Sequence, residues 1–137
     1  SWEGWLFLAL AHRDLRDWER AADSLVEVLR LCPQHAEALS ERALVLLSLG
    51  RHEEAVDHAR LAVRGAPDDA AMRSNLGLVL MEAGDLPRAR AEFERAARLD
   101  PSDPVVARCL REVRKRDRKD ARWGESWGSE GIESTEG

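Results

Sequence analysis

The segment RLCPQHAEAL (residues 30–39) places a proline between the end of one amphipathic stretch and an alanine-rich start of the next. The same arrangement recurs in RGAPDDAAM (64–72) and in RLDPSDPVV (98–106). The prolines are Pro33, Pro67 and Pro101, so both intervals are 34 residues (67 − 33 and 101 − 67). A fixed period of this size predicts an array of structural repeats, in which each unit buries its apolar face against its neighbours.

The 34-residue period divides most of the chain into three units, 2–35, 36–69 and 70–103. Small side chains recur at three matching places of these units. They are Ala9, Ala43 and Gly77 at the eighth place, Ala21, Ala55 and Ala89 at the twentieth, and Val28, Ala62 and Ala96 at the twenty-seventh. Small residues let two helix axes approach closely, so each unit is predicted to be a pair of amphipathic helices.

The signals for helix ends agree with this arrangement. The first helices are expected at 2–14, 36–49 and 70–83, and the second helices at 18–31, 52–65 and 86–99. Gly50 and Gly84 follow two of the first helices, where a left-handed backbone is least strained in glycine. Aspartate is a favoured N-cap residue, and it precedes four of the predicted helices at Asp17, Asp69, Asp85 and Asp103. His35 occupies the equivalent place before the second unit and is a weaker candidate.

The composition supports a helical, globular chain. Hydrophobic residues make up 44% of the sequence, Tyr is absent and Phe occurs twice. Leu, Ala and Val must therefore build the core, and Ala and Leu are strong helix formers. The net charge of −5 is unevenly spread: residues 1–107 carry −6 (13 Lys/Arg, 19 Asp/Glu), residues 108–122 carry +5 (8 against 3), and residues 123–137 carry −4 (0 against 4).

The third unit carries the most specific motif, NLGLVLMEAGDLPRARAEFERAARLDP (75–101). In this motif the chain resembles the tetratricopeptide repeat family. The matching residues are Leu76, Gly77, Gly84, Ala89, Phe93, Ala96 and Pro101, with Trp5, Leu8, Ala9, Ala21 and Pro33 in the first unit and Ala43, Gly50, Ala55, Ala62 and Pro67 in the second. The chain departs from the family at His12, Leu46 and Leu80 (often Tyr) and at Leu25 and Ala59 (often Phe). The resemblance implies an all-α, right-handed superhelix of stacked antiparallel helix pairs.

The C-terminal part is expected to close the stack. Residues 104–122 are predicted to form a capping helix, since an apolar stripe can cover the last repeat. The stripe consists of Val105, Val106, Cys109, Leu110 and Val113. The acidic tail, 123–137, is rich in Gly, Ser and Glu and is expected to be disordered unless it docks. Its Trp123 and Trp127 form a candidate docking motif, because Trp is enriched in binding hot spots.

The first predicted helix is apolar around most of its circumference, through Trp2, Trp5, Leu6, Phe7, Leu8 and Leu10. An end helix should be polar on its outer side, so we expect either earlier repeats or another surface to pack there. The sequence also lacks an initiator Met, which suggests a piece of a longer chain.

In the resembling family, the first helix of each unit lines a concave groove. The places that face this groove correspond to Leu6, Leu10, Arg13, Glu37, Ser40, Glu41, Leu44, Leu47, Ser74, Asn75, Leu78, Met81 and Glu82. They predict an apolar strip with acidic and amide margins, which suits an apolar or amphipathic peptide with basic flanks. The alternative is that several of these leucines pack only between neighbouring first helices.

Some members of the resembling family bind the acidic EEVD tails of heat-shock chaperones through a clamp of Lys, Asn and Arg. The corresponding places here are Leu6, Leu10, Glu41, Ala71 and Asn75. None of them is basic, and Glu41 repels a carboxylate. EEVD tails are therefore not expected as ligands.

The basic segment RKRDRKDAR (114–122) has two interpretations. Clustered Lys and Arg attract the phosphates of nucleic acids or acidic membranes. Asp117 and Asp120 interrupt the cluster, however, and no aromatic residue lies within it. A solvated helix end is the preferred interpretation, so neither nucleic acid nor membrane is expected as a partner.

The sequence contains no motif for catalysis or metal binding. His52 and His58 are six residues apart, whereas two ligands on one helix face require an i, i+4 spacing. Cys32 and Cys109 are isolated, which favours a reducing, cytoplasmic location. No segment approaches the roughly 18–20 apolar residues of a membrane span. We expect a non-enzyme without cofactor or metal.

The sequence thus predicts a tetratricopeptide-like scaffold, adaptor or chaperone-like protein that binds another protein through its groove. Two alternatives stay open. The chain could self-assemble into a homo-oligomer through the apolar first helix or the Trp-containing tail, or it could be a regulatory region of a larger enzyme. The residues that define the repeats are not those that select a ligand, so the partner is not specified by the pattern.

Overall fold

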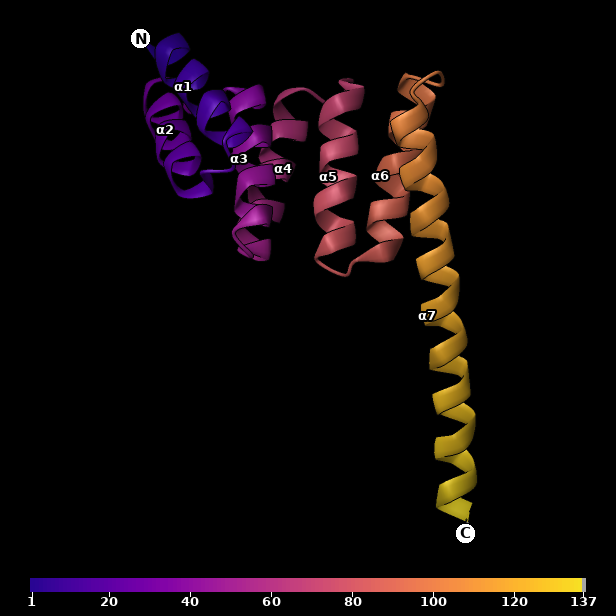
Figure 1. The fold of residues 1–137 in the computed structure, drawn as a ribbon. Helices are drawn as coiled ribbons and strands as arrows, with labels where there is room; N and C mark the ends of the chain where they lie inside the picture. Colours follow the sequence, from indigo (N-terminus) through magenta and orange to yellow (C-terminus); the bar gives the residue numbers. More distant parts are fainter. Residues whose placement is uncertain (137) are drawn as a thin grey trace.

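The chain forms a stack of helices in a computed structural model (Figure 1). The structure describes the backbone of residues 1–136 and the side chains of residues 1–123, and this part contains no strand. The helices are α1 (Trp2–Asp14), α2 (Trp18–Leu31), α3 (Ala36–Ser48), α4 (His52–Gly65), α5 (Ala70–Glu82), α6 (Leu86–Leu99) and α7 (Pro104–Glu136). The predicted all-α solenoid of stacked helix pairs is confirmed.

The helices pair in the order that the period predicts. Each first helix packs against the second helix of its own unit, and each second helix packs against the first helix of the next unit. The first helices α3 and α5 also contact each other directly, whereas no two second helices pack comparably within the described chain. Since the first helices lie closer together, they form the inner side of the stack.

The small residues at the repeated places are buried, as predicted. Ala43, Ala55 and Ala62 of the second unit are all 0% exposed, and their counterparts in the other units are also buried. The third unit shows why the size matters, because a Cβ atom added at Gly77 would lie 2.9 Å from the ring of Phe93. The ring of Phe93 thus fills the space that an alanine side chain occupies in the other units.

The helix ends follow the expected chemistry, except that the first unit has arginine where the other two units have a left-handed glycine. Gly50 and Gly84 have φ of +79° and +92°, in the left-handed region. Arg16 takes the equivalent place in the first unit with φ of +60°. His35, the weaker candidate cap, does cap α3, because its Nδ1 atom accepts a hydrogen bond of 3.1 Å from the backbone N–H of Ala38. The ring of His35 also contacts that of Trp2, with 4.7 Å between centroids.

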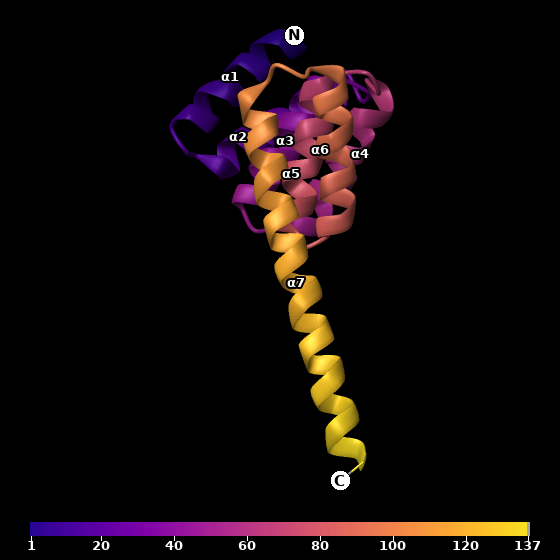
Figure 2. The same cartoon turned by 90° about the vertical axis from the view of Figure 1, so that its right-hand side faces the viewer.

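Helix α7 closes the stack and is longer than predicted. Val106 and Val113 are buried at the α6 end, and Asp117 pairs with Arg90 of α6 at 3.0 Å. The helix does not stop at residue 122 but continues to Glu136 beyond the stack (Figures 1 and 2). That residues 123–137 are disordered unless they dock stays a prediction. The chain has no proline after Pro104, so a helix nucleated by packing of its first turns can propagate.

Candidate functional site

The predicted groove residues lie on the inner helices α1, α3 and α5, and we call them the first-helix surface. Leucines form its apolar part: Leu6, Leu10, Leu44, Leu47 and Leu78 are all partly exposed. Leu44, Leu47 and Leu78 also pack against the core shared by α3 to α7. These leucines therefore support the stack with one side of the side chain and leave the other side accessible.

Polar residues of the first-helix surface connect consecutive first helices. The guanidinium of Arg13 on α1 donates to the Glu41 carboxylate on α3 at 2.6 Å. This hydrogen bond raises the pKa of Arg13 above its usual value. The Nδ2 atom of Asn75 on α5 donates to Oγ of Ser40 on α3 at 2.7 Å. Glu41 and Asn75 are therefore held by partners within the stack.

Two residues of the predicted groove are corrected by the structure. Ser40 is 2% exposed and Met81 is 7% exposed. Ser40 faces Asn75, and Met81 belongs to the core cluster. Both side chains therefore face into the stack and are not accessible to a ligand, and the name first-helix surface excludes them from here on. Ser74 is partly exposed, and Glu37 and Glu82 are exposed at the margins.

Helix α7 adds residues to this site that the sequence reasoning missed. Arg116 lies 3.8 Å from Glu82 of α5 and 2.9 Å from Glu112 of its own helix. Cys109, two turns before Arg116 on the same side, is partly buried, and desolvation raises the pKa of its thiol. If the 34-residue period is extended to residues 104–137, α7 takes the place of a further first helix. The period could therefore have predicted that α7 contributes residues to this site.

The acidic margin expected from the sequence is largely paired. Glu41 carries the ion pair with Arg13, and Glu82 lies near Arg116. Of the candidate tail motif, Trp123 is 59% exposed, and the side chain of Trp127 lies outside the described residues. The described side chains contain no group of three His, Cys, Asp or Glu residues that could hold a metal ion. In the described chain, no helix is both long enough and apolar enough to cross a membrane.

Sequence comparison identifies the repeat. Two profiles of the tetratricopeptide repeat match residues 7–70 and 46–113. The chain is 30% identical over 115 residues to the Hsp70-Hsp90 organizing protein of Triticum aestivum, covering 84% of this chain and 20% of that protein. The matched segment thus spans a fifth of the wheat protein's length.

Solved structures share the fold. The Sgt2 TPR domain from Aspergillus fumigatus superposes with a TM-score of 0.83 at 22% identity, covering 88% of this chain and 82% of that domain. The first TPR of Spaghetti (RPAP3), bound to the HSP90 peptide SRMEEVD, has a TM-score of 0.79 at 18% identity, with 83% and 90% covered. The profiles, the helix pairs and these superpositions agree: the chain belongs to the tetratricopeptide repeat family, whose members mediate protein–protein interactions.

Proposed function

We propose that this chain is a non-catalytic scaffold or adaptor that binds an apolar or amphipathic peptide along the first-helix surface. The observation that carries the proposal is the row of five partly exposed leucines on α1, α3 and α5. Consecutive inner helices present this row at similar places of the repeat. A helical or extended ligand can therefore contact several leucines at once, with anchors at i and i+3 or i+4 in a helix.

The size of the leucine row limits the affinity. Full burial of a leucine side chain contributes roughly 1.5–3 kcal/mol, and each of these leucines is already partly buried in the stack. If about half of that amount remains, five leucines give a gross gain of roughly 4–8 kcal/mol. Association costs about 4–15 kcal/mol. The leucines alone thus provide at most about 4 kcal/mol, which is about millimolar affinity, so tighter binding requires additional polar contacts.

The expected preference for basic flanks and the exclusion of acidic EEVD tails stay predictions. The Spaghetti domain that shares this fold holds an HSP90 peptide of that type, so such a peptide is a necessary test ligand. None of the five clamp places is basic here, and Glu41 is engaged with Arg13. The predicted cytoplasmic location is likewise untested.

We expect the double variant Leu44→Glu/Leu78→Glu to lose peptide binding by about tenfold or more. Carboxylates placed in the leucine row would have to be desolvated by an apolar ligand, and this costs more than the lost apolar contact alone. Peptides are first selected from a random library for binding to the immobilised chain. The affinities of the best selected peptide and of SRMEEVD for wild type and variant are then measured by fluorescence anisotropy.

The matched control is Leu31→Glu/Leu61→Glu, which makes the same chemical change at two leucines that are 44% and 45% exposed on second helices. It should leave the affinity unchanged, and circular dichroism should show both variants folded. If both double variants bind the selected peptide as wild type does, the first-helix surface is not the binding site. Tight binding of SRMEEVD would overturn the exclusion of EEVD tails.

A second candidate function is self-assembly, which is favoured by the exposed apolar face of α1. Phe7 of α1 and Leu15, the C-cap residue that follows α1, are each 78% exposed, and Trp5 and Leu8 are 38% and 40% exposed. In the second unit, by contrast, Leu39 at the place of Trp5 is 6% exposed. An apolar face of this kind is typical of an interaction site.

If a second copy covers this face, the mass measured by light scattering should rise with protein concentration. The variant Phe7→Glu/Leu15→Glu should then be monomeric over the same range, because the two carboxylates resist desolvation. The Leu31→Glu/Leu61→Glu control should behave as wild type. A single monomer mass at every concentration would remove this candidate.

A further inference from the structure

Helix α7 carries a row of cations on one face, which we call the basic stripe. Its residues are Arg108, Arg111, Lys115, Arg118, Lys119 and Arg122, and all six are exposed. Their spacing of three, four, three, one and three residues keeps them on one side of an α-helix. The stripe spans 15 residues, and the 14 steps between its ends correspond to about 21 Å at 1.5 Å per residue.

The acidic residues that interrupt the basic segment in the sequence do not interrupt the stripe. Asp117 points to α6, where it pairs with Arg90 at 3.0 Å. Asp120 follows the buried Val113 by seven residues, which places it on the side of α7 that faces the stack. Glu112 lies at the edge of the stripe, four residues after Arg108, and its carboxylate pairs with Arg116 at 2.9 Å. The sequence-based reason for excluding a polyanion therefore does not apply to the folded chain.

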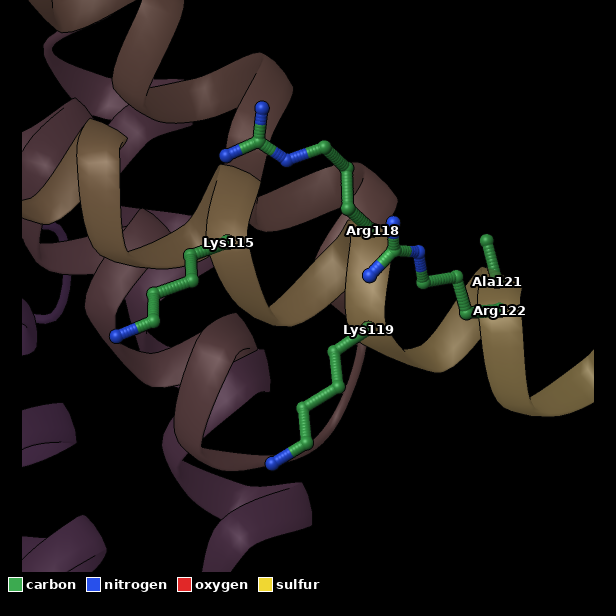
Figure 3. A pocket seen from close by; sticks show the side chains of 5 residues that line it. All are labelled: Lys115, Arg118, Lys119, Ala121 and Arg122. Carbon is green, nitrogen blue, oxygen red and sulfur yellow. The ribbon is translucent and has the colours of Figure 1, made fainter.

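The stripe faces outward at the end of the stack. In the end-on view of Figure 2, α7 lies in front and no other element covers its outer side. Figure 3 shows Lys115, Arg118, Lys119 and Arg122 extending from the helix. Together with Ala121 they line an open hollow of about 670 Å³. Among the described side chains, carboxylates pair with Arg114 and Arg116 but with none of the stripe residues. These charges are available to an external anion.

An exposed aromatic ring stands at the end of the stripe. Trp123 is 59% exposed and follows Lys119 by four residues, so the two lie on adjacent turns of one face. Nucleic acid bases that are not paired stack on such rings, and stacking on an aromatic side chain tolerates any base.

We propose that the basic stripe and Trp123 bind a single-stranded nucleic acid. Its phosphates contact the cations along α7, and an unpaired base stacks on Trp123. The site is on the outer face of α7 and does not depend on peptide binding at the first-helix surface.

The composition of the stripe favours this partner over two others. An acidic protein segment would gain about 0–1 kcal/mol per exposed ion pair. Protein interfaces rely on several apolar or aromatic anchors that fill pockets, whereas a single exposed aromatic residue, Trp123, is described beside the stripe. A membrane-bound helix inserts an apolar face, but Val106 and Val113 of α7 are buried, and α7 packs against α6. Phosphates of a nucleic acid need no apolar contact, because counterion release provides the affinity.

The test uses the full chain and a fluorescent single-stranded oligonucleotide of about 12 nucleotides. We expect anisotropy to show binding at about 50 mM salt. The logarithm of the association constant, plotted against the logarithm of the salt concentration, should have a slope near −4, because each of six phosphate contacts contributes about −0.7. Lys115→Glu/Lys119→Glu should weaken binding about tenfold or more and reduce the slope by about 1.4. Trp123→Ala should weaken binding about fivefold with the slope unchanged.

The matched control is Arg30→Glu/Arg60→Glu, which changes the net charge equally at two exposed residues of α2 and α4. It should bind within about twofold of wild type, and so should Leu44→Glu/Leu78→Glu. No binding at the lowest salt overturns the proposal, and so does an equal loss in the Arg30→Glu/Arg60→Glu control. Tighter binding to anionic phospholipid vesicles or to a poly-glutamate peptide than to the oligonucleotide assigns the stripe to a different partner.

Discussion

Replacing Phe93 with alanine is expected to lower the free energy of unfolding by about 3–5 kcal/mol. Phe93 is 0% exposed in the core between α5 and α6, and its ring packs directly on the backbone at Gly77. Alanine would leave a cavity that the glycine opposite cannot fill, because it has no side chain to move into it. Urea unfolding followed by circular dichroism measures the difference.

Two further variants separate the specific contact from a general loss of apolar surface. Gly77→Ala should destabilise the chain by about 1–3 kcal/mol through overpacking, although alanine is the better helix former. Adding Phe93→Leu should recover part of this loss, since leucine at this place faces alanine in the first unit (Leu25 and Ala9). A neutral or stabilising Gly77→Ala would contradict the close approach.

The period made most of the fold predictable from sequence. Each helix boundary up to Leu99 lies within one residue of its predicted place, because prolines, glycines and aspartates act locally on the backbone. The pairing of small residues was also predictable, since the same three places must be small in every unit. Even the size compensation at Gly77 is visible in the sequence, where the unit with Phe93 is the one that has glycine.

The contacts within the candidate site were less predictable. Arg13 and Glu41 are 28 residues apart, and nothing in the period specifies that their side chains pair. The frame placed Ser40 and Met81 on the correct helices but could not give the depth at which the inner helices pack. The length of α7 was missed because its tail is poor in helix formers, while the absence of a proline allows the helix to continue.

The charges of the basic segment were predicted to interrupt one another because they alternate in linear order. Helical geometry separates them: Asp117 turns to Arg90 on α6, while Lys115, Arg118 and Lys119 remain exposed on the other side. A helical projection that starts from the buried Val106 and Val113 places Asp117 on their side of α7 and the three cations away from it. This separation therefore follows from residue spacing, once the apolar stripe of α7 is taken as its buried face.

Replacing Glu92 with alanine is expected to destabilise the chain by roughly 2–3 kcal/mol. Glu92 on α6 pairs with Arg73 on α5 at 3.1 Å, and both side chains are only 15% exposed. Arg73 also donates from Nε to the backbone carbonyl of Pro67 at 3.0 Å. Without Glu92, a largely buried guanidinium loses its counter-charge. The estimate lies below the roughly 3–5 kcal/mol of fully buried pairs because some solvent still reaches both groups.

The matched control, Glu94→Ala, makes the same substitution two residues further along α6. Glu94 lies 3.8 Å from Arg90 and 3.7 Å from Arg114, but its side chain is 38% exposed, so its removal should cost less than about 1 kcal/mol. Equal effects of the two variants in urea unfolding would show that burial of the Arg73–Glu92 pair does not matter. A large effect of Glu92→Ala alone would show that the Arg73–Glu92 pair stabilises the stack. Since Arg73 also donates to the carbonyl of Pro67, the pair would then connect the turn at Pro67 to helices α5 and α6. The prolines that set the repeat period would then also be points at which the stack is held together.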